Sequence, residues 1–174
     1  FYNKLLKNET NRGKGYSVKR GIIESKGTHI IFHDGDLEYD PEDILKFEKI
    51  FKKFDADGII GSRFNYADYT RSHNILNKFA NNTITLIFNL FNNTTFTDIY
   101  SCYFAFKKDL LDPNRLETSG FEQHAEIISK VIKKGKKFYE VPINYNGRAY
   151  SDGKKIRPQH FFLIIYQIIL RRFF

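Results

Sequence analysis

The sequence has no tryptophan, no methionine and only one cysteine, Cys102, among its 174 residues. A single cysteine cannot form an internal disulfide, which excludes a small disulfide-stabilised scaffold and suits a reducing compartment. The longest apolar stretches are interrupted before they reach about 18 residues, the length at which a membrane-spanning helix becomes a candidate. The residues given therefore predict no membrane span.

The beginning of the sequence also lacks two familiar features. The first residue is Phe1 rather than methionine, and no basic stretch followed by a long apolar run marks a signal peptide. We expect from this that the sequence is a fragment of a longer chain.

What the sequence does have is an ordinary globular composition with a basic balance. Hydrophobic residues make up 41% and charged residues 28%, which argues against wholesale disorder and fits a single domain over residues 1–174. Lys and Arg number 28 against 20 Asp and Glu, a net charge of +8. A basic surface favours anionic partners, whether nucleic acid, phosphate-rich ligands or acidic lipid head groups.

The hydrophobic pattern predicts alternating helices and strands. Helices are expected over residues 14–25, 41–54, 71–90, 121–134 and 158–174, and strands over 28–33, 58–64, 100–106 and 138–145. This alternation predicts an α/β domain with a largely parallel sheet, whose ligands bind beyond the carboxyl ends of the strands. Pro142 in the last strand indicates a sheet edge or a bulge.

An acidic segment directly follows the first predicted strand. Asp34, Asp36 and Glu38 alternate along it, so in an extended chain they point to one side. Like charges held that close repel one another unless a cation lies between them, and carboxylate oxygens suit Mg²⁺ or Mn²⁺. The segment therefore predicts a divalent metal site that is shared with substrate phosphates.

The acidic segment has three other interpretations. A plain acidic turn that caps the helix beginning at Pro41 has the same composition. An EF-hand loop is excluded because Tyr39 stands where that loop requires glycine. A phosphatase of the haloacid dehalogenase type also places Asp-x-Asp after a strand, but it usually has threonine where Glu38 stands.

Taken in order along the chain, the motifs resemble the polyprenyl-phosphate glycosyltransferases of family 2, which include dolichyl-phosphate mannosyl- and glucosyltransferases. The matching segments are Asn11–Gly15, Asp34–Asp43, Gly61–Phe64, Thr97–Asp98 with Cys102–Tyr103, Phe121–Glu122, Glu126–Ile127, Glu140–Arg148 and Gly153–Ile156. Two features depart from the family pattern: Phe104 stands where lysine is common, and the opening strand with its Pro-x-Tyr-Asn-Glu motif is missing.

This resemblance implies a fold and a reaction. The fold is a GT-A-type nucleotide-sugar-binding domain, α/β, with a mostly parallel sheet flanked by helices and its first strand or strands missing. The reaction is an inverting, metal-dependent transfer of a sugar from a GDP- or UDP-sugar to a polyprenyl (dolichyl or undecaprenyl) phosphate. A Mg²⁺ or Mn²⁺ ion held by Asp34, Asp36 and Glu38 would stabilise the leaving diphosphate.

The resemblance also assigns roles to particular side chains. Asp36 and Asp98 are the expected catalytic carboxylates, with Asp98 positioning acceptor or sugar more than acting as a base. The expected phosphate-binding residues are Lys14, Arg63, Arg71 and Arg148, since cationic side chains, arginine above all, bind phosphate oxygens. Glu122 and Glu126 are expected near the sugar, and a loop with Lys154 and Lys155 is expected to close over substrate.

The C-terminal helix expected over 158–174 is strongly apolar from Phe161 to Leu170 and continues into Arg171 and Arg172. That pattern is typical of a helix lying in a membrane interface with its arginines near acidic head groups. The segment from Asn74 to Phe91 is expected to do the same. A buried core helix and a membrane-spanning segment that is cut short at Phe174 are the alternatives. The expected location is cytoplasmic, peripheral on the inner face of the membrane.

Three other functions fit the same sequence. A family 2 enzyme with a saccharide acceptor would keep the acidic segment but would not depend on a lipid phosphate. A basic, non-catalytic nucleic-acid-binding module fits the charge, although no recognised motif of that class is present and we expect no nucleic acid partner. A non-catalytic scaffold is the third.

Overall fold

A computed structural model describes residues 3–65, 68–71, 75–148 and 159–173, with only the backbone described at Gln159. The elements in chain order are α1 (Lys14–Glu24), β1 (His29–Ile31), α2 (Ile44–Phe54), β2 (Gly58–Ser62), α3 (Ile75–Asn92), β3 (Phe104–Lys107), α4 (Gln123–Lys134), β4 (Phe138–Pro142) and α5 (Gln159–Phe173). The alternation of helices and strands predicted from the sequence is confirmed, with boundaries that differ by a few residues.

The four strands form one sheet in the order β1-β3-β2-β4. The sheet is mixed, because β3 pairs antiparallel with both β1 and β2, and only β2 and β4 pair in parallel. The expectation of a largely parallel sheet is corrected in this respect: β1, β2 and β4 run in one direction, but the reversed β3 separates β1 from β2. Pro142 ends β4, which is an edge of the described sheet, as the proline indicated.

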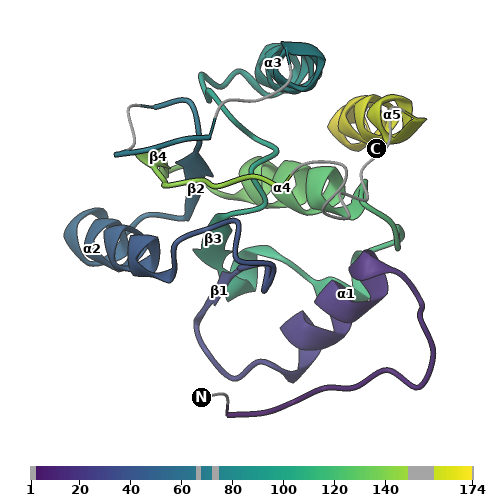
Figure 1. Cartoon of the computed structure of the whole chain (residues 1–174). Coiled ribbons are helices and arrows are strands. Elements are labelled where there is room, and N and C mark those ends of the chain that lie inside the picture. Colours follow the sequence, from purple (N-terminus) through teal and green to yellow (C-terminus); the bar gives the residue numbers. More distant parts are fainter. Residues whose placement is uncertain (1–2, 66–67, 72–74, 149–158, 174) are drawn as a thin grey trace.

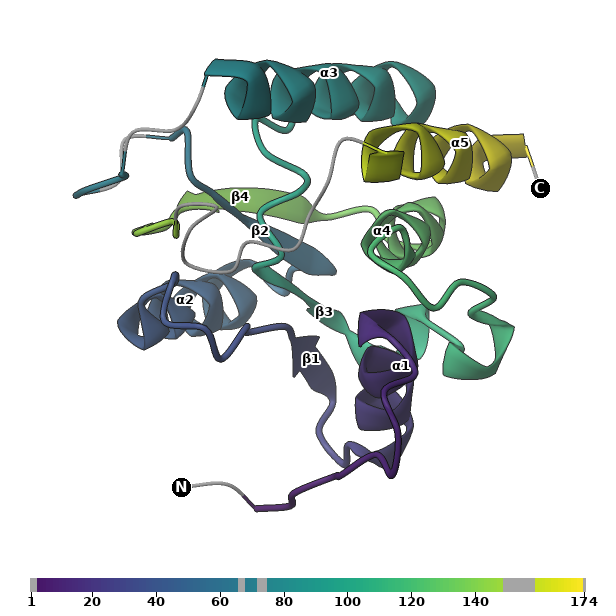
Figure 2. The same ribbon diagram turned by 45° about the vertical axis from the view of Figure 1, so that its right-hand side comes forward.

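Helices cover both faces of the sheet (Figure 1). On one face lie α3, α4 and α5, with α5 packed against both of the others, and α2 lies on the opposite face (Figure 2). Pro41 begins a short 3₁₀ turn that leads into α2, and the Asp40 carboxylate accepts the backbone N–H of Glu42 at 2.9 Å. This is the helix start that the sequence predicted at Pro41.

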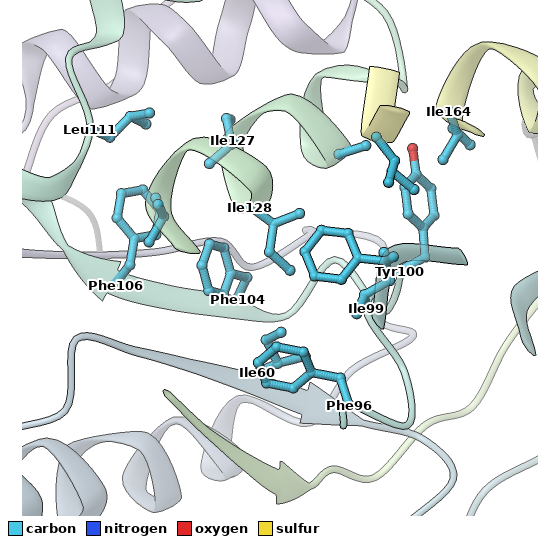
Figure 3. Packing of buried hydrophobic residues seen from close by; sticks show 14 of the residues in the cluster. Ile60, Phe96, Ile99, Tyr100, Phe104, Phe106, Leu111, Ile127, Ile128 and Ile164 are labelled. Carbon is cyan, nitrogen blue, oxygen red and sulfur yellow. The ribbon is translucent and has the colours of Figure 1, made fainter. Parts of the chain in front are cut away.

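The central strand β3 divides two apolar clusters. Phe104 and Phe106 point into the larger cluster, which also contains Ile127 and Ile128 of α4 (Figure 3). The two phenylalanine rings stack with their centroids 5.0 Å apart. The alternate residues Tyr103 and Ala105 point into the smaller cluster, which packs against α2. Burial on both faces explains why β3 is an interior strand. It also explains Phe104, which stands where the family commonly has lysine: its side chain is completely buried.

The outer helices α3 and α5 each bury one side only. Ile84 and Phe88 of α3 and Ile164 and Ile168 of α5 are core residues, whereas other large apolar side chains of both helices are exposed. Within the part of the chain that the structure describes, no helix is long and apolar enough to cross a membrane.

Candidate functional site

The fold brings several predicted site residues to one edge of the sheet. Because β1, β2 and β4 run in the same direction, the segments that follow them emerge at the same edge. Asp34 and Asp36 follow β1, Arg63 follows β2, and Arg148 follows β4. The Thr97–Asp98 segment reaches the same place, since Asp98 is bonded to Arg63. The site therefore forms where ligands of open α/β sheets are expected.

Arg63 and Asp98 form a buried ion pair. The guanidinium donates from Nε to Oδ2 at 2.7 Å and from Nη2 to Oδ1 at 2.9 Å, and the Arg63 backbone N–H donates to Oδ2 at 3.1 Å. Asn81 of α3 donates to Oδ1 at 2.9 Å. The Asp98 side chain is fully buried and that of Arg63 is 12% exposed. The pairing with Asp98 raises the pKa of Arg63 well above its ordinary value, against the opposing effect of burial.

The four bonds just described occupy both oxygens of Asp98. A carboxylate held in this way is a fixed partner that orients Arg63. For Asp98, this geometry suits the expected positioning role better than it suits proton transfer. The Arg63 guanidinium also lies over the ring of Tyr145, 5.1 Å from the ring centroid, so the pair is supported from the β4 side as well.

A second group of contacts ties the acidic segment to Arg148. Arg148 donates from Nη2 to Asp36 at 2.6 Å, and from Nε and its backbone N–H to Glu38 at 2.9 and 3.0 Å. The hydroxyl of Tyr145 donates to the other oxygen of Glu38 at 2.9 Å. Burial acts to raise the pKa of Glu38, but these hydrogen bonds outweigh it and the pKa lies below its ordinary value.

Lys14 is the counter-ion of Asp34. Its ammonium lies 2.8 and 2.9 Å from the two oxygens of the Asp34 carboxylate. Helix α1 presents Lys14 from a tightly packed start: Gly13 has a left-handed φ of 86°, and Gly15 donates its backbone N–H to the Ser119 carbonyl at 2.8 Å. A Cβ on Gly15 would come within 2.6 Å of the Ser119 backbone, so the position requires glycine.

The expected three-carboxylate metal cluster is not assembled in this structure. No group of three or more His, Cys, Asp or Glu side chains suited to a metal ion occurs among the described residues. The reason is local: both oxygens of Glu38 are taken by Arg148 and Tyr145. Asp34 and Asp36 remain as half-buried carboxylates, each beside a cationic side chain. Carboxylate oxygens are the ligands that Mg²⁺ and Mn²⁺ prefer, and both carboxylates already have a positive charge beside them. The position therefore fits a divalent cation.

The other predicted residues are placed as follows. Arg71 precedes α3 and donates to the Gly147 carbonyl at 2.8 Å, so it lies next to the Arg148 segment. Glu122 accepts the Gly120 backbone N–H. Glu126 is fully buried and accepts from three donors, the backbone N–H groups of Glu117 and Thr118 and the Thr118 hydroxyl, which turns it into the fold and away from the other site residues. The loop with Lys154 and Lys155 lies outside the described residues.

Sequence reasoning missed four residues that lie in or beside this site: Asn81, His124, Glu140 and Tyr145. Glu140 and Tyr145 lie in the C-terminal motif, but the residues they contact are distant in the sequence. Their membership of the motif was therefore the signal in the sequence that could have identified them. His124 donates from Nε2 to the Ile99 carbonyl at 3.0 Å, and burial lowers its pKa to about 4.

A cavity of about 450 Å³ opens beside this site between α1, β1 and α4. Lys14 and Asp34 lie at its wall, and most of the remaining lining is apolar, including Ile22 and Phe32. Gln123 also lines the cavity, and its buried Oε1 has no hydrogen-bond partner among the described residues. An apolar cavity with a few polar groups at its wall is the usual form of a small-molecule site.

Sequence comparisons find relatives of this chain among known proteins. An uncharacterized protein of Methanocaldococcus jannaschii is 28% identical over 84% of this chain and 67% of its own length. Glycosyltransferase AglJ of Haloferax volcanii is 27% identical over 94% of this chain and 54% of its own length. A dolichyl-phosphate beta-glucosyltransferase of Dictyostelium discoideum is 40% identical, but only over 37% of this chain and 21% of its own length.

Solved structures give the same answer for the fold. Glucosyl-3-phosphoglycerate synthase from Mycobacterium tuberculosis, in its complex with phosphoglyceric acid, superposes with a TM-score of 0.64 at 12% identity over 94% of this chain. A complex of that enzyme with Mn²⁺, UDP-glucose and glycerol 3-phosphate superposes with a TM-score of 0.60 at 10% identity. The GT-A type of α/β fold expected from the sequence is thereby confirmed.

The chain spans between half and two thirds of the two relatives that it matches over most of its length, and 56% of the first solved structure. The family profile described as Glycosyl transferase family 2 matches residues 3–114, the part that contains Lys14, the Asp34–Glu38 segment, Arg63 and Asp98. The chain belongs to glycosyl transferase family 2.

Proposed function

We propose that this chain forms the metal- and phosphate-binding part of a glycosyltransferase that moves a sugar from a nucleotide-sugar to a polyprenyl phosphate. The observation that carries the proposal is the gathering of Asp34, Asp36, Lys14, Arg148 and the Arg63–Asp98 pair at one edge of the sheet. A leaving diphosphate gains negative charge, which a divalent cation held by carboxylates and cationic side chains both stabilise.

Within this function, Asp34 and Asp36 would hold Mg²⁺ or Mn²⁺, which supplies Lewis-acid stabilisation of the leaving diphosphate when bound. Lys14 and Arg148 neutralise these carboxylates in the present structure and are placed to contact phosphate oxygens beside them. Arg71 lies in the neighbouring segment, and the Arg63–Asp98 ion pair lies at the same edge of the sheet. The solved structure with Mn²⁺ and UDP-glucose in a protein of the same fold supports a nucleotide-sugar donor and a metal.

The cavity beside Lys14 is a candidate binding site for part of the nucleotide-sugar donor. It is open to the same segment as Asp34, and its unpaired Gln123 oxygen can accept a hydrogen bond from a ligand N–H or O–H. A mostly apolar cavity with such an acceptor suits a nucleoside.

The lipid acceptor is supported by the outer surface of α3 and α5. Exposed apolar side chains gather on these two neighbouring helices: Ile75, Leu76, Phe79, Leu86 and Leu90 on α3, and Phe162, Leu163, Tyr166 and Phe173 on α5. We define these nine residues as the α3–α5 surface. An apolar surface of this kind with cations at its border suits a membrane interface, peripheral on the cytoplasmic side, and with it a lipid acceptor.

One detail of the expected membrane contact is corrected. Arg171 was expected near lipid head groups, but its side chain is 8% exposed and binds the Glu117 carboxylate through Nη1 and Nη2 at 3.0 and 2.7 Å. Arg172 and Lys78 are the exposed cations on these helices.

The test is transfer of radiolabelled sugar from a panel of GDP- and UDP-sugars to polyprenyl phosphate in detergent, with and without Mn²⁺. The variants are Asp36→Asn and, as a matched control, Glu48→Gln, which removes an exposed carboxylate of α2. Label in the lipid phase that requires Mn²⁺, persists in Glu48→Gln and disappears in Asp36→Asn is the expected result. Label that appears only on a saccharide acceptor would replace the lipid acceptor, and no transfer to either would overturn the proposal.

A further inference from the structure

Glu140 of the edge strand β4 is a carboxylate with an unusual set of partners. Its oxygens accept the backbone N–H of Thr97 at 2.9 Å, the backbone N–H of Asp98 at 3.1 Å and the hydroxyl of Thr97 at 3.0 Å. Asn65 donates its side-chain amide to Oε2 at 3.0 Å. Each partner is a neutral donor, so the carboxylate has no cationic partner among these contacts.

The partners of Glu140 lie in the turn that presents Asp98 to Arg63. Thr97 and Asp98 are 43 and 42 residues away from Glu140 in the sequence, so the bonds join two distant segments. The Thr97 hydroxyl is also 2.6 Å from that of Ser62, the last residue of β2 and the neighbour of Arg63. Glu140 therefore fixes the backbone of the turn from one side while Arg63 binds the Asp98 side chain from the other.

This arrangement carries a cost that a purely structural contact could avoid. Burial raises the pKa of Glu140, because the hydrogen bonds do not fully offset the loss of water around its charge. A neutral side chain could join β4 to the turn with a smaller desolvation penalty. A carboxylate offers what a neutral side chain does not: two oxygens that only accept. Oε1 accepts the backbone N–H groups of Thr97 and Asp98, while Oε2 accepts the Thr97 hydroxyl and the Asn65 amide.

We infer that Glu140 is a positioning residue of the glycosyl transfer site, which sets the place of Asp98 and, through it, of the Arg63 guanidinium. The inference rests on the proposed function, because it takes the Arg63–Asp98 pair as part of the reacting site. Displacement of a site group by about 1 Å can lower a rate about a hundredfold. Loss of Glu140 should therefore reduce transfer far more than its effect on folding explains.

Two variants of Glu140 separate its hydrogen bonds from its charge. Glu140→Ala removes every acceptor. Glu140→Gln keeps one carbonyl oxygen for the Thr97 and Asp98 amides, while the Asn65 amide and the Thr97 hydroxyl can reverse their roles to accept from its NH₂ group. We expect kcat to fall about tenfold to a hundredfold in Glu140→Ala, with a smaller change in KM, and to recover most of its value in Glu140→Gln.

The matched control is Asp57→Ala. Asp57 also accepts two consecutive backbone N–H groups, those of Lys136 and Lys137 at 2.7 and 3.0 Å, but it precedes β2 and so lies at the opposite end of that strand from Arg63. Asp57→Ala removes the same pair of backbone hydrogen bonds, together with an ion pair to Lys107 at 3.2 Å, at a place without site residues. We expect it to lower Tm about as much as Glu140→Ala while leaving kcat and KM unchanged.

A spectroscopic measurement makes the test independent of transfer. The Arg63 Nε–H is hydrogen-bonded to buried Asp98, so its NMR signal should show slow hydrogen exchange in the wild type and in Asp57→Ala. In Glu140→Ala the exchange rate of this proton should rise at least about tenfold. Unchanged protection in a folded Glu140→Ala protein would overturn the inference, as would an equal kcat loss in Asp57→Ala. A wild type that shows this protection but transfers no sugar would instead defeat the proposed function alone.

Discussion

The Arg63 guanidinium binds the Asp98 carboxylate side-on, with Nε 2.7 Å from Oδ2 and Nη2 2.9 Å from Oδ1. These hydrogen bonds link the residue that follows β2 to the segment that precedes β3, the strand that runs antiparallel to its neighbours β1 and β2. The Asp98 side chain is completely buried, so this pair joins the two segments with its carboxylate shielded from water.

Breaking this pair from one side should be severe. Asp98→Asn leaves the Arg63 charge without its partner, and removal of one member of a buried pair typically costs about 3–5 kcal/mol. Urea unfolding should show a loss of this size, whereas Asp55→Asn, at an exposed ion pair with Lys107, should leave the midpoint unchanged. The double variant Arg63→Met with Asp98→Leu should lose less stability than Asp98→Asn. A loss below about 1 kcal/mol in Asp98→Asn would contradict the buried pairing.

Two glycines of α1 should respond to alanine in opposite directions. A Cβ at Gly15 meets the Ser119 backbone at 2.6 Å, whereas a Cβ at Gly21 meets nothing within 4 Å. Gly21→Ala should raise the free energy of unfolding by about 0.5–1 kcal/mol through helix propensity, and Gly15→Ala should lower it because the backbone must shift. Thermal and urea unfolding of the two variants provide the comparison. Equal stabilisation by both would show that α1 does not pack against Ser119.

Stability should depend on pH through His124. Burial, with a further contribution from the Lys14 charge, lowers the pKa of His124 to about 4 from an ordinary 6.5. As pH falls below 6.5 the unfolded chain takes up this proton and the folded chain does not, so the stabilisation is complete above pH 6.5 and is lost as pH falls toward 4.

The loss attributable to His124 should be about 2 kcal/mol at pH 5. Because carboxylates also titrate in this range, the measurement is the difference between wild type and His124→Gln in urea unfolding at pH 7 and pH 5. Glutamine keeps an N–H donor for the Ile99 carbonyl but does not titrate. A difference that is the same at both pH values would show that His124 is accessible to protons in the folded state.

The α3–α5 surface should bind membranes. Replacing Phe79 and Phe162, which are 70% and 73% exposed, by serine removes two large apolar contacts without disturbing the core. Wild type should co-sediment with vesicles containing acidic lipid, and the double variant should bind at least about tenfold more weakly. Leu45→Ser on α2, where the side chain is 65% exposed, is the control and should bind as wild type does. Equal binding by all three proteins would place any membrane contact elsewhere.

The sequence predicted the local parts of this protein well because they depend on neighbours in the chain. Pro41 suits the first turn of a helix, and the structure begins a 3₁₀ turn there that leads into α2. The acidic segment, Arg63, Asp98 and Arg148 were all identified as site residues from motifs. What failed was the direction of β3, since its apolar run fits a parallel and an antiparallel interior strand equally well.

By itself, then, the sequence determined the order of elements, the family resemblance and the chemical types gathered at the site, because periodicity and motif spacing are local properties. Only the tertiary structure decided which charges meet. Glu38 binds Arg148 and Tyr145 instead of joining Asp34 and Asp36, and Glu140 holds the Asp98 turn across 42 residues. Such pairings depend on which strands lie side by side, and a one-dimensional pattern does not contain that information.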